Sequence, residues 1–156
     1  MKITLLVVGK TTDAHIEALL QDYQKRLVHY VPFSIAVIPE LKNTKSLTSE
    51  QQKQAEGELI LRQITPSTDM ILLDERGKEY RSIEYADYLQ KKMSSGRDVV
   101  FVVGGPYGFS QAVYERANGK ISLSKMTFSH QMVRLFFVEQ IYRAMTILRG
   151  EPYHHE

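Results

Sequence analysis

The first motif with a possible chemical role is Gly9-Lys10-Thr11, which follows a short apolar run. A glycine-lysine-threonine sequence forms part of the phosphate-binding loop of many nucleotide hydrolases. That loop needs another glycine five positions earlier, because its backbone amides must wrap around the phosphates. Thr4 occupies that position, inside the apolar run itself. The sequence therefore excludes ATP or GTP hydrolysis by a loop of this kind.

A second candidate site is the run Gly104-Gly105-Pro106-Tyr107-Gly108, directly after the apolar segment Val99–Val103. Glycines let a ligand approach the backbone closely, and residues 105–108 carry proline and glycine where a type I turn favours them. No lysine follows to hold a phosphate, and the spacing is not that of a dinucleotide-binding fingerprint. Two interpretations stay open: a ligand-binding turn, or a tight connection between a strand and a helix.

A third candidate is the segment 123–128, which mixes small polar and apolar residues: Leu123, Ser124, Lys125, Met126, Thr127 and Phe128. The backbone amides and carbonyls of such a loop can meet the edge of an adenine, while Met126 or Phe128 covers its ring. A plain connecting loop has the same composition, so the pattern alone does not decide between the two.

The C-terminal residues Tyr153-His154-His155 are the last candidates. Adjacent histidines are not the helical pair, four residues apart, that binds zinc, and we expect no metal site. The chain has no cysteine, which excludes thiolate metal sites, thiol nucleophiles and disulfides. These residues are thus either a frayed end or a functional tail.

Strand-like and helix-like segments alternate around these motifs. Apolar or alternating runs predict strands at residues 3–8, 33–37, 70–73, 99–103 and 121–123. Capping residues and apolar spacing predict helices starting at Thr12 or Asp13, at Thr48 or Ser49, and near residues 82, 110 and 129. The charged segment 75–80 is predicted to be a turn. The alternation predicts one α/β domain over residues 1–156, with a mainly parallel sheet covered by helices on both faces.

The length and charge agree with a single globular domain. The chain has 156 residues and a formal net charge of +2, and no apolar run approaches the roughly 20 residues of a membrane-spanning helix. No secretory signal core is present, so a cytoplasmic location is expected. The five basic residues between positions 120 and 149 face only one acidic residue, Glu139. This segment suits contact with a polyanion, or equally a solvated helix face.

The last predicted helix has more apolar residues than one buried face requires. Twelve of the eighteen positions from 132 to 149 are apolar. Phe137, Ile141 and Met145 share the face expected to meet the sheet, while Phe136 lies on the other side near Arg134. This second face predicts either a homodimer interface or further packing within the chain.

Several sequence features together resemble one protein family along the whole chain. These features are 72–78 (LLDERGK), 96–98 (GRD), 103–108 (VGGPYG), the 123–128 loop, His130 with Arg134, 139–144 (EQIYRA) and 152–154 (PYH). In this order they closely resemble the RlmH (YbeA) family of the SPOUT superfamily of methyltransferases. The combination is specific, although each piece alone is not.

The resemblance implies more about the fold and the cofactor than the residue pattern does. Family members thread the C-terminal segment through a loop to form a trefoil knot, against the general rule for protein chains. They are homodimers and use S-adenosylmethionine (SAM). By this resemblance the cofactor-binding residues are Leu73, Gly104, Gly105, Gly108, Leu123, Ser124, Lys125, Met126, Thr127 and Phe128.

The resemblance also implies the reaction. Family members methylate N3 of a pseudouridine in the helix 69 stem-loop of 23S rRNA in the assembled ribosome, and DNA or a membrane is not an expected partner. The catalytic residues implied are Tyr153 and His154, with His154 as the acceptor of the N3 proton or with direct loss of that proton to water.

RNA contacts are expected from Lys125, Arg134, Arg143 and His155, and binding should weaken as salt rises. His155 stands where several relatives carry arginine or lysine. Two alternatives are an inactive knotted module that binds RNA or SAM, and a SPOUT methyltransferase of another RNA.

Overall fold

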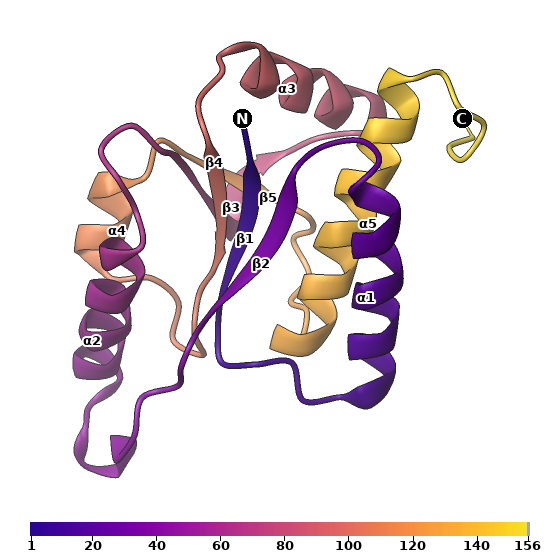
Figure 1. The fold of residues 1–156 in the computed structure, drawn as a ribbon. Helices are drawn as coiled ribbons and strands as arrows, with labels where there is room; N and C mark the ends of the chain where they lie inside the picture. The colour runs from indigo at the N-terminus through magenta and orange to yellow at the C-terminus, as the bar shows by residue number, and fades with distance from the viewer. Residues whose placement is uncertain (156) are drawn as a thin grey trace.

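The computed structural model describes residues 1–155, and within this range five strands form one sheet in the order β2-β1-β4-β3-β5. The strands are β1 (Ile3–Val8), β2 (Phe33–Ile38), β3 (Asp69–Glu79), β4 (Val99–Val103) and β5 (Gly119–Ser122). All neighbouring strands pair in parallel. The predicted parallel sheet is therefore confirmed, and its carboxyl ends meet along one edge (Figure 1).

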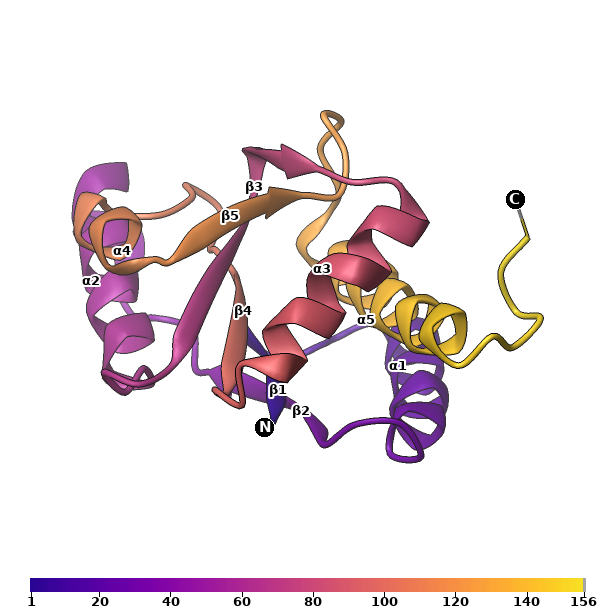
Figure 2. The same ribbon diagram turned by 90° about the horizontal axis from the view of Figure 1, so that it is seen from above.

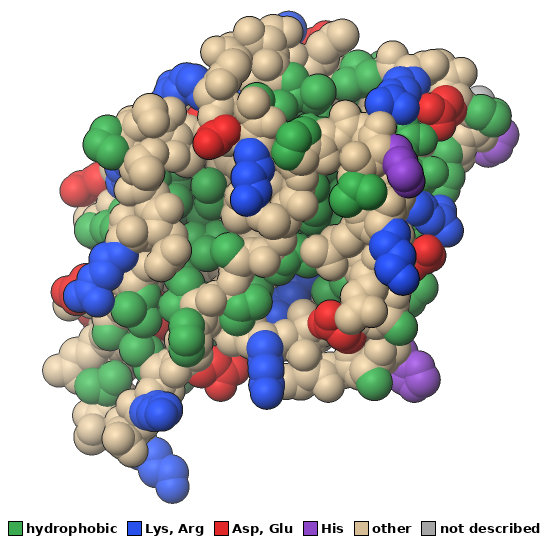
Figure 3. All heavy atoms as spheres, in the orientation of Figure 1, with side chains coloured by type: hydrophobic (Ala, Val, Ile, Leu, Met, Phe, Trp, Pro, Cys, Tyr) green, Lys and Arg blue, Asp and Glu red, His purple; other side chains and the backbone are tan. Residues whose placement is uncertain are grey.

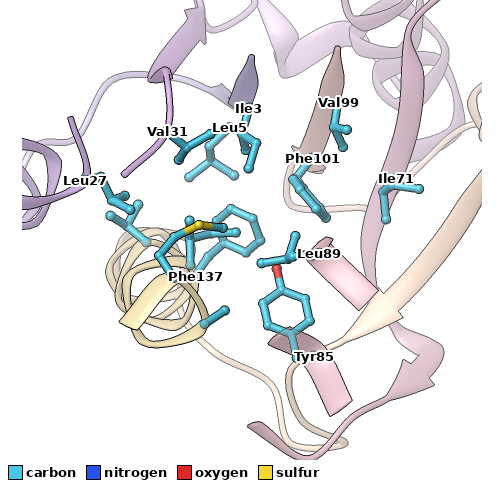
Figure 4. Packing of buried hydrophobic residues seen from close by; sticks show 14 of the residues in the cluster. Ile3, Leu5, Leu27, Val31, Ile71, Tyr85, Leu89, Val99, Phe101 and Phe137 are labelled. Atoms are coloured by element: carbon cyan, nitrogen blue, oxygen red, sulfur yellow. The ribbon is translucent and has the colours of Figure 1, made fainter. Parts of the chain in front are cut away.

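Helices cover both faces of the sheet, as predicted (Figures 1 and 2). On one face lie α1 (Ala14–Leu27), α3 (Ser82–Ser94) and α5 (His130–Leu148); on the other lie α2 (Ser49–Arg62) and α4 (Gln111–Arg116). A short 3₁₀ helix, η1 (Thr44–Ser46), precedes α2. Successive strand residues point to opposite faces, so the sheet has two apolar cores. In the larger core the rings of Phe101 and Phe137 lie 4.9 Å apart (Figure 4).

The helices begin where the sequence predicts, and the structure decides between the capping alternatives. The carboxylate of Asp13, not Thr12, accepts hydrogen bonds from the first amides of α1. Thr48 forms a capping box with Gln51 at the start of α2. Ser110 and Ser129 cap α4 and α5. Each side-chain cap satisfies an amide that the helix cannot bond itself.

The prediction of a turn at residues 75–80 is wrong for most of that segment. It belongs to β3, which pairs with β5 up to Leu73, leaves the ladder, and pairs again from Lys78 opposite Ile121. Gly77 permits this return, because a Cβ atom there would lie 2.6 Å from the backbone of Ile121. Residues 74–77 therefore bulge out of the sheet at its carboxyl edge.

The prediction that Arg134 contacts RNA is also wrong, because Arg134 is only 2% exposed. Its guanidinium donates to the carbonyl of Val8 at 3.0 Å, to Oγ1 of Thr11 at 3.1 Å and to the carbonyl of His130 at 3.0 Å. These bonds tie the first turn of α5 to the end of β1. Among the described residues, no helix has the length and apolarity needed to cross a membrane.

Candidate functional site

A cavity of about 480 Å³ lies at the carboxyl edge of the sheet, where β3, β4 and β5 end side by side. Its lining includes Leu73, the residue at which β3 leaves its pairing with β5, and Val103 and Ser122, the last residues of β4 and β5. The volume lies in the range of small-molecule and cofactor sites. In open α/β sheets this edge is where ligands usually bind.

The glycine run forms one wall of the cavity, and the predicted turn is confirmed. The amide of Gly108 donates to the carbonyl of Gly105 at 3.1 Å, and Gly108 has a φ of +83°, which favours glycine. A Cβ atom on Gly104 would lie 3.1 Å from the ring of Phe109. Because the wall lacks side chains at these glycines, a ligand can reach the backbone directly.

The 123–128 loop forms the opposite wall and is held by its own hydrogen bonds. Ser122 donates to the carbonyl of Ser124 at 2.9 Å, and the amide of Met126 donates to Oγ of Ser124 at 2.9 Å. Phe128 packs against Phe136 of α5, with ring centroids 5.1 Å apart. Met126 is 78% exposed. The loop therefore offers both apolar side chains and backbone polar groups to the cavity.

The structure brings together nine of the ten residues predicted to bind a cofactor. They are Leu73, Gly104, Gly105, Gly108, Leu123, Ser124, Met126, Thr127 and Phe128. Lys125 is the exception: its side chain is 84% exposed, and its Nζ lies 3.8 Å from the carboxylate of Glu79. The lysine side chain therefore points away from the cavity.

Sequence reasoning missed a third group of lining residues, which includes Asp74, Glu75 and Arg76 from the bulge of β3. Asp74 accepts hydrogen bonds from the hydroxyl of Tyr114 and, at 2.8 Å, from the amide of Arg76. Burial and the bond to Asp74 raise the pKa of Tyr114 to about 12, so this hydroxyl keeps its proton at neutral pH. Gly77 was the one available signal, since a glycine inside a strand often marks a bulge.

The two predicted catalytic residues, Tyr153 and His154, do not line this cavity in their own chain. Val133, in the first turn of α5, lines the cavity, whereas the tail follows Leu148 at the other end of the helix (Figure 1). From Leu148 the tail turns back along α5 and contacts Glu139 and Arg143, which lie six and ten residues beyond Val133, or about 9 and 15 Å of helix rise. Neither catalytic candidate is therefore part of the cavity of its own chain.

The tail is held against α1 and α5 by polar and aromatic contacts. The hydroxyl of Tyr153 donates to Glu139 at 2.9 Å and lies 3.1 Å from the hydroxyl of Tyr23. Burial and these hydrogen bonds raise the pKa of Tyr153, so it stays a neutral phenol. Arg143 donates to Nδ1 of His154 at 3.1 Å. Because a guanidinium can only donate, that nitrogen is not available to take a proton in this position.

The remaining residues predicted to contact RNA differ in their surroundings. Arg143 forms a 2.7 Å ion pair with Glu139 and lies over the ring of Tyr153, so it is engaged by the tail. His155 is exposed. Across residues 1–155 there is no cluster of three or more His, Asp or Glu side chains arranged to hold a metal ion.

Comparisons with known proteins agree with this geometry. Residues 1–154 match the family model described as "Predicted SPOUT methyltransferase". The chain is 61% identical to a Bacteroides thetaiotaomicron protein and 59% identical to a Parabacteroides distasonis protein, over 157 residues and 100% of each chain. A Flavobacterium psychrophilum protein is 57% identical over the same extent. All three are named ribosomal RNA large subunit methyltransferase H. The chain therefore belongs to the SPOUT methyltransferase family.

Proposed function

We propose that this protein is a SAM-dependent methyltransferase of large-subunit ribosomal RNA, and that it methylates N3 of a pseudouridine in helix 69 of 23S rRNA. The observation that carries the proposal is the cavity at the sheet edge, walled by the glycine turn and the 123–128 loop. The names of full-length relatives at about 60% identity support ribosomal RNA as the substrate. The choice of base rests on the family resemblance.

The cavity residues fit SAM as the cofactor. Leu73, Val103, Leu123 and Phe128 provide apolar walls for an adenosine, and the loop backbone provides donors and acceptors for its polar edge. In the sequence, no lysine follows the glycine run as it does in a phosphate-binding loop, which suits a cofactor without phosphate groups. When bound, SAM supplies a methyl group already activated on a positively charged sulfur. The protein's remaining task is to hold the acceptor base in line with that group.

The acceptor nitrogen carries a proton in neutral pseudouridine, so the proton must leave during methyl transfer. We infer that Tyr153 and His154 take part from a second copy of the chain, because neither lines the cavity of its own chain and both are held against Glu139 and Arg143 of α5. Release of His154 from Arg143 would free its Nδ1 for this role. Direct loss of the proton to water is the alternative.

A homodimer is the assembly that this role requires. Support comes from α5, where Met132 and Phe136 remain 36% and 40% exposed, and where Phe136 packs against the cavity residue Phe128. Large apolar side chains gathered on one helix face are typical of an interface between protein chains. We further infer that the segment leading into α5 is threaded as a trefoil knot, on the strength of the SPOUT family match.

The RNA-contacting surface is inferred to lie around the cavity mouth. The exposed residues Lys10, Lys42 and Lys45 follow β1 and β2 at the carboxyl edge, and Lys53 and Arg76 line the cavity itself. Figure 3 shows Lys and Arg side chains along the lower margin of the molecule, the side toward which the strands run in Figure 1. Such side chains can neutralise RNA phosphates. They replace Arg134 in this role.

Two measurements test the proposed function. Thermal melting with millimolar SAM should raise the unfolding temperature, and the absence of any shift would favour a module that does not use SAM. Mass mapping of 23S rRNA from a deletion strain should show loss of the methyl group on the pseudouridine. An unchanged methylpseudouridine would point to a methyltransferase of another RNA.

A further inference from the structure

The carboxyl group of Glu56 lies directly behind the glycine turn of the cavity. Glu56 is on α2 and is only 4% exposed. A Cβ atom added to Gly105 would lie 2.3 Å from its Oε1 and 2.7 Å from its Cδ and Oε2. All three of the nearest atoms to that position belong to this carboxyl group. The side chain and the turn are therefore in direct contact.

Hydrogen bonding does not explain why a carboxyl group is buried here. Its Oε2 accepts one long bond, 3.4 Å, from the amide of Gln52, and its Oε1 has no hydrogen-bond partner in the described structure. A buried polar atom without a partner lowers the stability of the fold. No step of the proposed reaction uses this group, so its burial calls for another explanation.

The neighbouring residue fixes where this carboxyl group lies. Gly57 packs against Ser110, and a Cβ atom at Gly57 would lie 2.4 Å from Oγ of Ser110. Ser110 caps α4, the helix that directly follows the glycine turn. The close approach of α2 to α4 at Gly57 thus brings the side chain of Glu56 against Gly105.

We propose that Glu56 is a positioning residue, whose buried carboxyl group supports Gly105 from behind and so holds the glycine turn in the conformation that binds SAM. The inference rests on the proposed function, since it concerns the same cavity. It also gives a reason for glycine at position 105. Gly105 does not have a positive φ, so its backbone would accept alanine, and the steric obstacle is the carboxyl group of Glu56.

The proposal predicts a specific pattern among four variants, measured as the dissociation constant of SAM by calorimetry. Glu56→Ala removes the support and should weaken binding about tenfold, because a binding wall displaced by a fraction of an ångström loses its fit. Glu56→Gln keeps the shape and should stay within about twofold of the original chain. Gly105→Ala forces the turn and the carboxyl group apart and should also weaken binding about tenfold.

The double variant Glu56→Ala/Gly105→Ala carries the decisive test. The new methyl group enters the space that the carboxyl group leaves, so the double variant should bind SAM more tightly than either single variant. If the two substitutions weakened binding independently, their effects on the dissociation constant of SAM would instead multiply. If Glu56 acted only on overall stability, relief of the overlap could bring the double variant to the affinity of Glu56→Ala but not beyond it.

Two control variants test whether weaker binding comes from the contact between Glu56 and Gly105, or from any lost charge on α2 or any methyl group added at a glycine. Glu58→Ala makes the same charge change at an exposed position of α2. Gly119→Ala adds a methyl group where the nearest atom is 3.4 Å away, an ordinary contact. Both should bind SAM like the original chain. Unchanged binding in Glu56→Ala, or multiplied losses in the double variant, would overturn the role of Glu56 alone. Failure of the original chain to bind SAM would overturn the proposed function and this role with it.

Discussion

Buried charged side chains are the residues whose roles are least visible in the sequence. Arg134 shows this: its place on α5 suggested an outward-facing cation, but its long side chain reaches back to the end of β1. Burial lowers the pKa of its guanidinium, yet arginine remains charged at neutral pH. Three acceptors surround that charge, which makes Arg134 a structural link and not a ligand for RNA.

Replacing Arg134 should therefore lower stability. We expect Arg134→Met to reduce the free energy of unfolding by about 2–4 kcal/mol, because buried carbonyl oxygens lose their donor. Chemical denaturation measures this loss. Arg62→Met, at an exposed position of α2, is the control and should change it by less than about 0.5 kcal/mol. Unchanged stability in Arg134→Met together with weaker RNA binding would restore the RNA-contact role.

A second prediction at the residue scale concerns Glu56 and the pH dependence of the free energy of unfolding. Burial raises the pKa of its carboxyl group above the ordinary value of 4.5, and the nearby charge of Glu40, after β2, acts in the same direction, whereas the amide of Gln52 opposes both. On the same helix Lys53 is paired with Glu50. A carboxyl group with a raised pKa in the folded state is protonated in both states at low pH. As pH rises above about 4.5, the unfolded chain ionises first, so the folded state loses relative stability.

The measured quantity is the difference in free energy of unfolding between the Glu56→Gln variant and the original chain. Glu56→Gln cannot ionise at this position, so its stability relative to the original chain should increase as pH rises from about 4 to 8. Denaturation curves at each pH give this difference, and the other titrating groups cancel in the comparison. A difference that stays constant with pH would mean that burial does not shift the pKa of Glu56.

At the scale of elements, the bulge of β3 connects the sheet to the cavity. It brings Asp74, Glu75 and Arg76 to the cavity wall, and Gly77 returns the strand to β5. We expect Gly77→Ala to lower the free energy of unfolding by about 1–3 kcal/mol, because the added methyl group overlaps the backbone of Ile121. SAM binding should weaken with it. Gly119→Ala, on the paired strand β5, is the matched control and should change neither the free energy of unfolding nor SAM binding. Equal effects of the two substitutions would contradict this role of the bulge.

The elements that the sequence predicts correctly are those determined by nearby residues. The apolar run of β4 and the capping residues Asp13, Thr48, Ser110 and Ser129 are local patterns, and the structure has them as expected. The bulge was missed because it depends on pairing with β5, more than forty residues further on. The helical periodicity of α5 identified its buried apolar face but missed Arg134, because a helix pattern does not show which atoms lie beyond the helix end. The contact between Glu56 and Gly105 likewise joins distant segments of the chain.

At the scale of the whole molecule, the open question is how the tail and the cavity meet. The tail lies against α1 and the C-terminal half of α5, and the cavity lies beside the first turn of α5. Neither Tyr153 nor His154 lines the cavity of its own chain. We expect that in a symmetric pair the tail of one copy reaches the cavity of the other. The position of the tail therefore predicts that each active site needs two chains.

Complementation between two inactive variants tests this prediction. One variant lacks residues 153–156 and keeps the cavity; the other keeps the tail but carries Thr127→Trp, which fills the cavity and is checked by loss of SAM binding. Each homodimer should be inactive. A heterodimer purified with two different affinity tags should regain about half of the original activity, because one of its two sites then combines an intact cavity with an intact tail. If the tail instead serves the cavity of its own chain, neither site of the heterodimer is complete, and it stays as inactive as its parents.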